Sequence, residues 1–339
     1  MKVISLLFVT LLGCYMCIAQ RLGKLPVHDP VLIQQGDCFY LFSTGQGITV
    51  ASSRDLKNWT REAPVFAEPP AWAVKAVPSF TGHIWAPDIS YHNGRYHLYY
   101  SVSAFGKNTS CIAVASNKTL DPKDPEFQWV DHGLLLQSFP GSTDWNAIDP
   151  NFICDEHGQP YLSFGSFWGG LKLVKLSKDG LRTNDDLTNL PTIASRRAAA
   201  DSIHSDLPQG VAENAIEAPF IFRHKNGYYY LFASIDYCCK GAASTYKMIV
   251  GRSKQLQGPY LDSEGIDMAK GGGKLLLEGN ADWHGVGHNA VLNIHSQDYL
   301  VFHGYDAKDG GKAKLLMEEL YWREDDWPTL LKSVYSENP

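Results

Sequence analysis

The chain has 339 residues and a formal net charge of −6 at pH 7, which allows one large domain or two smaller ones. Hydrophobic residues make up 44% of it and charged residues 19%, which are proportions of a folded globule and not of a disordered chain. A chain with this charge and no basic stripe is not expected to bind nucleic acid, because nothing in it neutralises a run of phosphates.

The first twenty residues predict export. Lys2 is followed by an apolar stretch from Val3 to Leu12, and Cys17-Ile18-Ala19 provides a small-residue ending, as in a cleavable secretory signal over residues 1–19. We therefore expect a secreted or periplasmic protein. The alternative is a lipid anchor through Cys14, because Leu11-Leu12-Gly13-Cys14 resembles a bacterial lipoprotein cleavage box. No later apolar run reaches the length of a membrane span.

Five short motifs then recur at intervals of roughly 60–70 residues, a spacing typical of a closed ring of small sheets. Each is followed by an aromatic-rich hydrophobic run. The motifs are Val27-His28-Asp29-Pro30, Trp85-Ala86-Pro87-Asp88, Ala147-Ile148-Asp149-Pro150, Ile216-Glu217-Ala218-Pro219 and Gly287-His288-Asn289-Ala290.

Each motif opens a predicted strand, which is followed by a turn and a second β-prone strand. The expected pairs are 31–33 with 38–42, 89–91 with 96–100, 151–154 with 161–164, 220–222 with 228–232, and 290–294 with 299–302. Third strands are expected at 48–51, 112–115, 171–174 and 248–251, and outer strands near Trp59, Trp129 and Tyr260. Four strands in each of five units predict an all-β, five-bladed β-propeller. We expect one catalytic domain over residues 25–330, with few helices.

Once the signal is removed, five cysteines remain: Cys38, Cys111, Cys154, Cys238 and Cys239. This odd number does not indicate a disulfide framework in a chain of this size. The spacing of paired C-x-x-C metal ligands is absent. Cys238 and Cys239 are adjacent, and the sequence leaves open whether they pair.

If every motif opens the innermost strand of a blade, the ring brings Asp29, Asp149 and Glu217 to one axial cavity. Carboxyl groups gathered there repel each other, so at least one should keep its proton near neutral pH. A protonated acid beside an ionised base is what hydrolysis of a glycosidic bond requires. Glu217 lies in an apolar stretch that favours its neutral form, so we assign it as the acid. From the residues alone, either aspartate can be the base. Asp88 is left out of the chemistry, because strand alternation turns it away from the cavity.

The motifs closely resemble those of glycoside hydrolase family 43, and the match runs from about Leu25 to Trp327. Two segments are similar to those of the endo-acting α-1,5-L-arabinanases within that family. The family motifs are His28-Asp29-Pro30, His83-Ile84-Trp85-Ala86-Pro87-Asp88, Asn146-Ala147-Ile148-Asp149-Pro150, Glu217-Ala218-Pro219, Gly287-His288-Asn289 and His303-Gly304-Tyr305-Asp306. The narrower segments are Gly165-Ser166-Phe167-Trp168-Gly169-Gly170, and Cys238-Cys239-Lys240-Gly241 with Ser244-Thr245-Tyr246-Lys247.

The resemblance implies a propeller that hydrolyses internal bonds of arabinan with inversion, Asp29 being the general base, Asp149 the residue that tunes the acid's pKa and Glu217 the general acid. It also implies an axial ion, usually calcium, near His288. One imidazole is a poor calcium site by itself, so this ion should be held mainly through water. The implied substrate contacts are Trp85, Phe105, Asn146, Ser166 and Trp168.

Two alternatives remain open. One is an exo-acting α-L-arabinofuranosidase or β-xylosidase on the same fold, and the other is a non-catalytic carbohydrate-binding propeller. For an inverting hydrolase, the carboxyl groups of Asp29 and Glu217 are expected to lie roughly 6.5–9.5 Å apart, leaving room for a water. The expected partners are arabinan or arabino-oligosaccharides, and the chain is expected to be a monomer.

Overall fold

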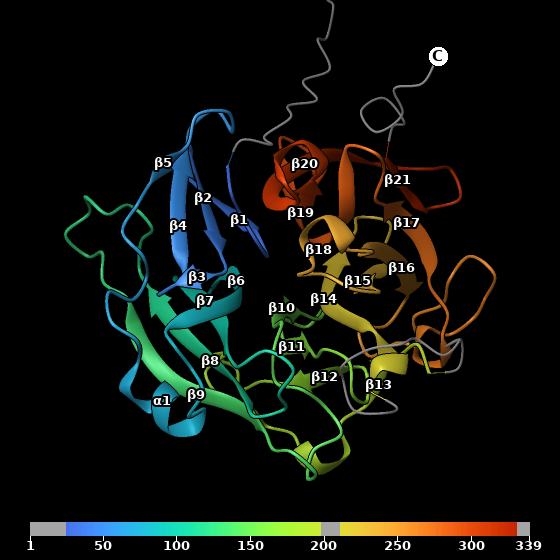
Figure 1. Cartoon of the computed structure of the whole chain (residues 1–339), viewed down its shortest axis with the longest axis horizontal. Coiled ribbons are helices and arrows are strands. Elements are labelled where there is room, and N and C mark those ends of the chain that lie inside the picture. The colour runs from blue at the N-terminus through green and yellow to red at the C-terminus, as the bar shows by residue number, and fades with distance from the viewer. Residues whose placement is uncertain (1–24, 198–210, 331–339) are drawn as a thin grey trace, which may run out of the picture.

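The computed structural model describes residues 25–197 and 211–330. Five antiparallel sheets surround a common axis as the blades of a propeller (Figure 1), and this confirms the predicted fold class. The predicted signal at 1–19 and Cys14 lie outside the described residues.

The strands follow one another from the axis outward in every blade. Blade I contains β1 (Val31–Gln35), β2 (Cys38–Ser43), β4 (Thr49–Ser53) and β5 (Thr60–Arg61). Blade II contains β6 (His83–His92), β7 (Arg95–Val102), β8 (Ser110–Asn117) and β9 (Val130–Ser138), and β3 (Gly45–Gln46) pairs with β6. Blade III contains β10 (Asn151–Cys154), β11 (Pro160–Phe164), β12 (Leu171–Lys175) and β13 (Thr192–Ala194). Blade IV contains β14 (Ile216–Arg223), β15 (Tyr229–Ile235), β16 (Lys247–Ser253) and β17 (Lys274–Glu278). Blade V contains β18 (Trp283–Ile294), β19 (Gln297–Asp306), β20 (Lys312–Trp322) and β21 (Pro328–Leu330).

Helices are short in the described part of the chain, as predicted. They are α1 (Ala71–Ala76) and the 3₁₀ turns η1 (Leu187–Asn189), η2 (Ala212–Asn214), η3 (Gly241–Ala243), η4 (Met268–Lys270) and η5 (Ala307–Asp309). None of these described helices has the length and apolar character needed to cross a membrane.

Local sequence explains the hairpins and the buried middle strands. Asn93 and Gly94 both have positive φ, at 49° and 77°, and they join β6 to β7 as the two central residues of a tight hairpin. The strand β15 reads Tyr-Tyr-Leu-Phe-Ala-Ser-Ile and is buried along its whole length. Both of its faces pack against neighbouring blades, which is why it is apolar throughout and does not alternate.

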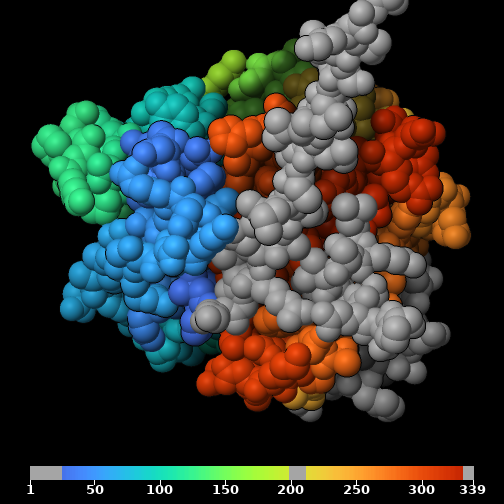
Figure 2. All heavy atoms as spheres, turned by 90° about the horizontal axis from the view of Figure 1, so that it is seen from above, coloured from blue at the N-terminus to red at the C-terminus, as the bar shows by residue number. Residues whose placement is uncertain are grey.

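The ring closes where the two ends of the described chain meet. The N–H of Val27 donates to the carbonyl of Ala313, and the N–H of Leu315 donates to that of Leu25. The segment before β1 thereby pairs with the first half of β20, while β21 pairs with the second half. Blades I and V consequently lie side by side, the blue and red parts of Figures 1 and 2.

One predicted strand is wrong. The outer strand of blade IV is Lys274–Glu278 and does not lie near Tyr260. The Tyr260 side chain is fully buried in the apolar core beside β16, and its hydroxyl donates to the carbonyl of Leu256. Its β-prone ring fills the core instead of belonging to an edge strand.

Candidate active site

The same unusual backbone conformation occurs once in each blade, next to the axis. Asp29, Ala86, Asp149, Ala218 and His288 have φ between 45° and 59°. Positive φ is uncommon outside glycine, and four of these five residues also precede a proline, which disfavours the helical region. Such strained positions cluster at functional sites, where the surrounding structure must hold them.

A hydrogen bond from the preceding blade holds each of these positions. The backbone N–H donates to a side chain at or just after the second strand of that blade in four cases. The pairs are Asp29 with His303 Nδ1 at 3.1 Å, Ala86 with Thr44 Oγ1 at 2.8 Å, Asp149 with Ser101 Oγ at 3.0 Å and His288 with Ser234 Oγ at 2.8 Å. This ring of bonds fixes the orientation of each blade relative to its neighbour.

Blade III breaks this pattern, and the exception connects Asp149 to the residue after Glu217. The position that corresponds to Ser101 and Ser234 is Gly165, whose N–H donates to the carbonyl of Ile148. Gly165 has φ +126°, and a Cβ there would lie 2.8 Å from the Gly170 carbonyl oxygen. Without a side chain at Gly165, the N–H of Ala218 donates instead to Oδ2 of Asp149, at 3.1 Å. Asp149 thereby holds the backbone next to Glu217.

Three imidazoles surround Asp29. Its Oδ1 lies 2.8 Å from His28 Nδ1, 3.1 Å from His288 Nδ1 and 3.7 Å from His303 Nδ1. Thr44 Oγ1 donates to its other oxygen. Burial alone would raise the pKa of Asp29, but the charges of His28 and His288 outweigh burial and hold it well below its usual range. Asp29 is therefore a buried carboxylate that stays ionised.

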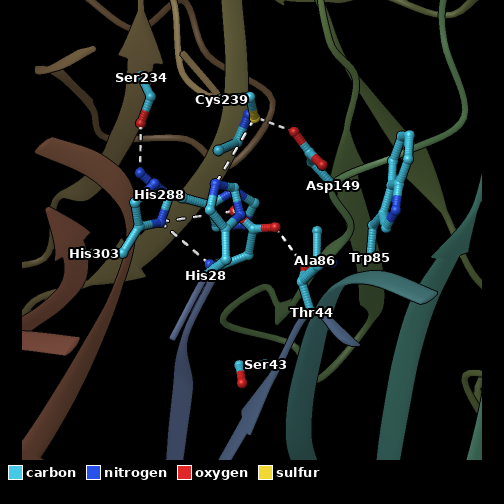
Figure 3. A network of polar contacts seen from close by, with 12 residues as sticks. His28, Ser43, Thr44, Trp85, Ala86, Asp149, Ser234, Cys239, His288 and His303 are labelled. Carbon is cyan, nitrogen blue, oxygen red and sulfur yellow. Dashed lines mark hydrogen bonds and ion pairs between the residues drawn. The ribbon is translucent and has the colours of Figure 1, made fainter. Parts of the chain in front are cut away.

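The histidines around Asp29 differ in charge. Burial opposes protonation of His28 and His288, yet Asp29 raises the pKa of both, that of His288 to about 9. Burial lowers the pKa of His303 well below its usual value, and the charge of His28 lowers it further. His303 Nδ1 accepts the N–H of Asp29, as expected of a neutral ring. Figure 3 shows these rings gathered at the inner ends of blades I and V.

The pKa values of Asp149 and Glu217 are raised, in contrast to that of Asp29. Burial raises the pKa of Asp149 well above its usual value; the charge of His288 opposes this, and the charges of Glu217 and Asp29 add to it. Burial also raises the pKa of Glu217, as does the charge of Cys239. Ser166 Oγ donates to Glu217 Oε2 at 2.9 Å, which favours the ionised form and limits that rise. The site thus combines an ionised carboxylate, Asp29, with carboxyl groups that tend to keep a proton.

The remaining predicted residues lie in different surroundings. Trp85 is half-buried on β6, and its Nε1 donates to His83 Nδ1 at 3.0 Å. Asn146 is buried, and its Oδ1 has no partner among the described residues. Trp168 has positive φ, and its carbonyl accepts from Asn214 Nδ2. Phe105 is 77% exposed.

Asp88, left out of the chemistry above, lies between two blades. It is buried, and its Oδ2 accepts the N–H of Phe152 at 2.7 Å. Asp88 therefore connects β6 to β10, an attachment between blades II and III.

Sequence reasoning assigned no role to several residues that contact the predicted site. His28 and His303 stand in motifs already quoted, and both contact Asp29. Tyr305 has its hydroxyl 2.9 Å from His28 Nε2 and accepts the N–H of Cys239 at 2.7 Å. His28 was detectable as the neighbour of Asp29 in sequence. The contacts of His303 and Tyr305 depend on ring closure, which no local pattern encodes.

The surroundings of His288 suit a water-bound cation better than a cation enclosed by the protein. In the described part of the chain, His288 belongs to no group of three His, Cys, Asp or Glu side chains with ligand atoms within 4.8 Å of one another. Its Nδ1 faces Asp29. The charge of Asp29 raises its pKa, and Asp149 and Glu217 add to this effect when they are ionised, so the axis attracts positive charge. These residues therefore fit an ion held mainly by water.

Known proteins resemble this chain over most of its length. Residues 23–328 match the model of the glycosyl hydrolases family 43. The extracellular exo-α-(1→5)-L-arabinofuranosidase ArbA of Cellvibrio japonicus is 51% identical, covering 90% of this chain and 86% of that protein. The extracellular endo-α-(1→5)-L-arabinanase 1 of Bacillus subtilis is 42% identical, covering 89% and 87%.

A solved structure supports the same relationship. The α-L-arabinanase of Cellvibrio cellulosa, complexed with arabinohexaose, superposes with a TM-score of 0.84 at 48% identity, covering 92% of this chain and 98% of that one. The family model and these relatives extend over all five blades. The chain therefore belongs to the glycosyl hydrolases of family 43 and is a glycoside hydrolase.

Proposed function

We propose that this enzyme hydrolyses α-1,5-L-arabinofuranosidic bonds of arabinan with inversion of configuration. The observation that carries the proposal is the opposite shift of two buried carboxyl groups on one axis, since the pKa of Asp29 is lowered and that of Glu217 is raised. An inverting hydrolase uses an ionised base to activate water and a protonated acid to release the leaving sugar. The substrate class is supported by the names of the relatives, which are arabinanases and arabinofuranosidases.

In the proposed reaction, Asp29 accepts a proton from a water as that water attacks the anomeric carbon. Glu217 gives its proton to the departing glycosidic oxygen, so one proton enters the enzyme and one leaves it. His28, His288 and Thr44 stabilise the charge of Asp29 through the contacts described above. Asp149 acts on Glu217 in two ways. Its Oδ2 holds the N–H of Ala218, and repulsion between the two carboxyl groups opposes ionisation of both at once.

Glu217→Gln tests the assignment of the acid. The amide keeps the shape of the side chain but has no acidic proton, so turnover of linear arabinan should fall at least about 10³-fold, with binding of arabino-oligosaccharides largely retained. Steady-state rates and calorimetric titration measure the two effects. Asp309→Asn is the control, since that half-buried carboxylate lies on η5 and pairs with Lys312. Unchanged turnover in Glu217→Gln would overturn the assignment.

We propose cleavage inside the polymer as the mode of action, following the similarity of two segments to endo-acting arabinanases. A specific observation favours the second candidate, release of sugar from the chain end: the relative that is 51% identical is named an exo-acting arabinofuranosidase. Early products from linear arabinan separate the two modes. A spread of oligomers indicates internal cleavage, whereas one short product from the first minutes indicates attack at an end.

We also propose a mainly water-coordinated calcium ion near His288, which when bound would offset part of the negative charge of the three carboxyl groups. If so, removal of calcium by a chelator should lower the thermal midpoint by a few degrees, and added calcium should restore it. Calorimetric titration of chelator-treated enzyme should detect one site, weakened by His288→Ala. Absence of calcium binding in the unmodified enzyme would contradict this prediction.

Export is proposed on the basis of the N-terminal sequence and of the word "extracellular" in the names of two relatives. Mass spectrometry of the protein recovered from the source culture would identify the mature N-terminus. Cleavage after Ala19 supports a simple secretory signal. A lipid-modified Cys14 supports the alternative anchor.

A further inference from the structure

A second cluster of chemically reactive side chains borders the acid and base. Cys238 and Cys239 lie in the loop between β15 and η3, and both are free thiols in the structure. The Sγ of Cys239 lies 3.7 Å from His28 Nε2 (Figure 3). Ligand atoms of His28, Cys238 and Cys239 all lie within 4.8 Å of one another. This is a set of one imidazole and two thiols, and the proposed reaction uses neither thiol.

The spacing of these atoms suits a tetrahedral metal. A zinc–sulfur bond of about 2.3 Å and a zinc–nitrogen bond of about 2.05 Å, at a tetrahedral angle, place the two ligand atoms about 3.6 Å apart. The observed 3.7 Å between Cys239 Sγ and His28 Nε2 is close to this value. Cys239 is exposed, so a cation can reach the cluster from solvent and keep a water as its fourth ligand.

The backbone around the cluster is already held in place. The Cys239 N–H donates to the Tyr305 hydroxyl, which also contacts His28 Nε2 at 2.9 Å. Cys239 has positive φ, at 64°, and its loop is fixed further by the N–H of Lys240, which donates to Ser244 Oγ. Binding therefore requires small rotations of side chains and no refolding of the loop. The Tyr305 hydroxyl has to give up its contact with His28 when a metal takes Nε2. His28 Nε2 and both thiols release their protons to solvent as the metal binds, and the Nδ1–H of His28 stays on Asp29.

We propose that His28, Cys238 and Cys239 bind one thiophilic divalent cation, such as Zn²⁺ or Cd²⁺, and that the bound cation inhibits hydrolysis. Thiolate and imidazole ligands select such metals, whereas calcium prefers oxygen. The site is thus distinct in chemistry from the axial ion near His288. Inhibition follows from position, because the other nitrogen of the His28 ring lies 2.8 Å from Oδ1 of Asp29. A cation bound at Nε2 changes the charge and the position of the His28 ring, which stabilises the proposed base Asp29.

Cadmium binding to the full chain tests whether these three residues bind a cation. The protein is reduced, freed of reductant and titrated with Cd²⁺ in excess Ca²⁺, which occupies oxygen-rich sites. We expect one Cd²⁺ per chain and an ultraviolet absorption band from thiolate-to-cadmium charge transfer. Cys238→Ser and Cys239→Ser should each weaken binding at least about 100-fold, since each removes a ligand of the metal.

Cys154→Ser is the matched control. Cys154 Sγ lies 3.9 Å from His92 Nδ1, so this variant also removes a thiol beside an imidazole, but at a different place in the molecule. Its cadmium affinity should equal that of the unmodified enzyme. Absence of the charge-transfer band would overturn the proposed site. So would a cadmium affinity in Cys238→Ser and Cys239→Ser equal to that of the unmodified enzyme. Because the band is read on the unmodified protein, a variant that fails to fold does not remove the test.

Turnover measurements test whether the bound cation inhibits hydrolysis. Each variant is compared with and without Cd²⁺, relative to its own metal-free rate. Saturating Cd²⁺ should lower the rate of the unmodified enzyme at least about tenfold and leave Cys239→Ser nearly unaffected. Binding without inhibition would overturn the inhibitory role and leave the site itself standing. This second part rests on the proposed arabinan hydrolysis, whereas the binding measurements need no substrate, so the two failures are distinguishable.

Discussion

At the scale of single residues, the environment sets the protonation of each carboxyl group. Asp29 and Glu217 are both buried, and burial alone would favour the neutral form of each. Asp29 differs because two histidines that it makes cationic lie within 3.1 Å of its Oδ1. Glu217 accepts instead from a neutral hydroxyl, that of Ser166. Two acids of similar intrinsic strength thereby become suited to opposite roles.

Ser166→Ala should shift the upper limb of the pH–rate profile. Ser166 donates a hydrogen bond to Glu217 and so stabilises the ionised form, which lowers the pKa of Glu217. Without this donor the pKa of Glu217 rises. The enzyme needs Glu217 protonated, so activity should persist to a higher pH. The expected shift is about one pH unit, the equivalent of roughly 1.4 kcal/mol. Rates with linear arabinan across the alkaline limb measure it.

Ser163→Ala is the control for this shift. Ser163 lies on β11, three residues from Ser166, and its hydroxyl donates to Asn151 and not to a proposed catalytic carboxyl group. The alkaline limb of this control should match that of the unmodified enzyme. A limb in Ser166→Ala that stays in place or moves to lower pH would contradict the assignment of Glu217 as the acid.

At the scale of strands, the proline spacing in the five motifs carries more information than the residue types. Asp29, Asp149 and Ala218 directly precede a proline, so Glu217 stands one position earlier than the aspartates. In the structure Asp29, Asp149 and Ala218 share one backbone conformation, as this spacing implies. The side chain of the proposed acid therefore projects from the residue before the positive-φ position, whereas that of the proposed base projects from the positive-φ position itself. Alignment of the motifs on their prolines would have detected this offset.

Inner strands were predictable from their apolar sequence and their flanking turn residues, and some outer strands lack these features. Inner and middle strands are apolar and bounded by turn residues such as Asn93-Gly94 and Asn226-Gly227. An outer strand is short and partly solvated, so little in its sequence distinguishes it from a loop. The outer strand of blade I has only two residues, Thr60 and Arg61. In blade IV the outer strand follows a glycine-rich run, and the apolar Tyr260 attracted the prediction instead.

Asp88 offers a test of the attachment between blades II and III. Burial raises its pKa to about 7, although hydrogen bonds from Phe152 and Asn151 oppose the rise. Its pKa in the unfolded chain is near 3.8, so the folded protein binds the proton more tightly. Stability from this group is therefore complete below pH 3.8 and is lost as pH rises through about 7. The loss is on the order of 4 kcal/mol.

Asp88→Asn should remove this pH dependence, because the amide still accepts the N–H of Phe152 but does not ionise. Between pH 5 and pH 8, the free energy of unfolding in urea should fall less in this variant than in the unmodified protein. Asp121→Asn is the control, since that exposed carboxylate also accepts a backbone N–H, from Lys123. Parallel profiles for Asp88→Asn and the unmodified protein would show that the raised pKa does not affect stability.

At the scale of the whole molecule, the candidate site exists because the ring closes. Asp29 belongs to blade I, whereas His288 and His303 belong to blade V, more than 250 residues later in the chain. The motif repeat predicted that such distant positions converge, and the structure confirms the propeller. The individual contacts around Asp29 were not predictable, because they depend on how the last blade is oriented relative to the first. A periodic sequence pattern does not specify that orientation.

Leu315→Ala tests whether this closure supports the site. Leu315 lies on β20, is fully buried, and packs in a cluster that joins residues of blade V to Val27, Leu32, Phe39 and Leu41. Its backbone N–H also donates to the carbonyl of Leu25. Truncation of a buried leucine costs about 2–5 kcal/mol. Because the lost contacts lie between blades I and V, the contact of His288 with Asp29 should loosen and turnover should fall as well.

Leu134→Ala is the matched control, since Leu134 lies on β9 of blade II and is 48% exposed. This change should alter the free energy of unfolding by less than about 0.5 kcal/mol and leave turnover unchanged. Thermal and urea denaturation measure stability, and rates are taken well below the lowered midpoint so that unfolding does not contribute. If Leu315→Ala destabilises the protein while turnover below the midpoint stays at the unmodified level, ring closure stabilises the fold but does not position the acid relative to the base. If turnover falls in proportion to the loss of the Asp29–His288 contact, the ring itself is part of the catalytic apparatus.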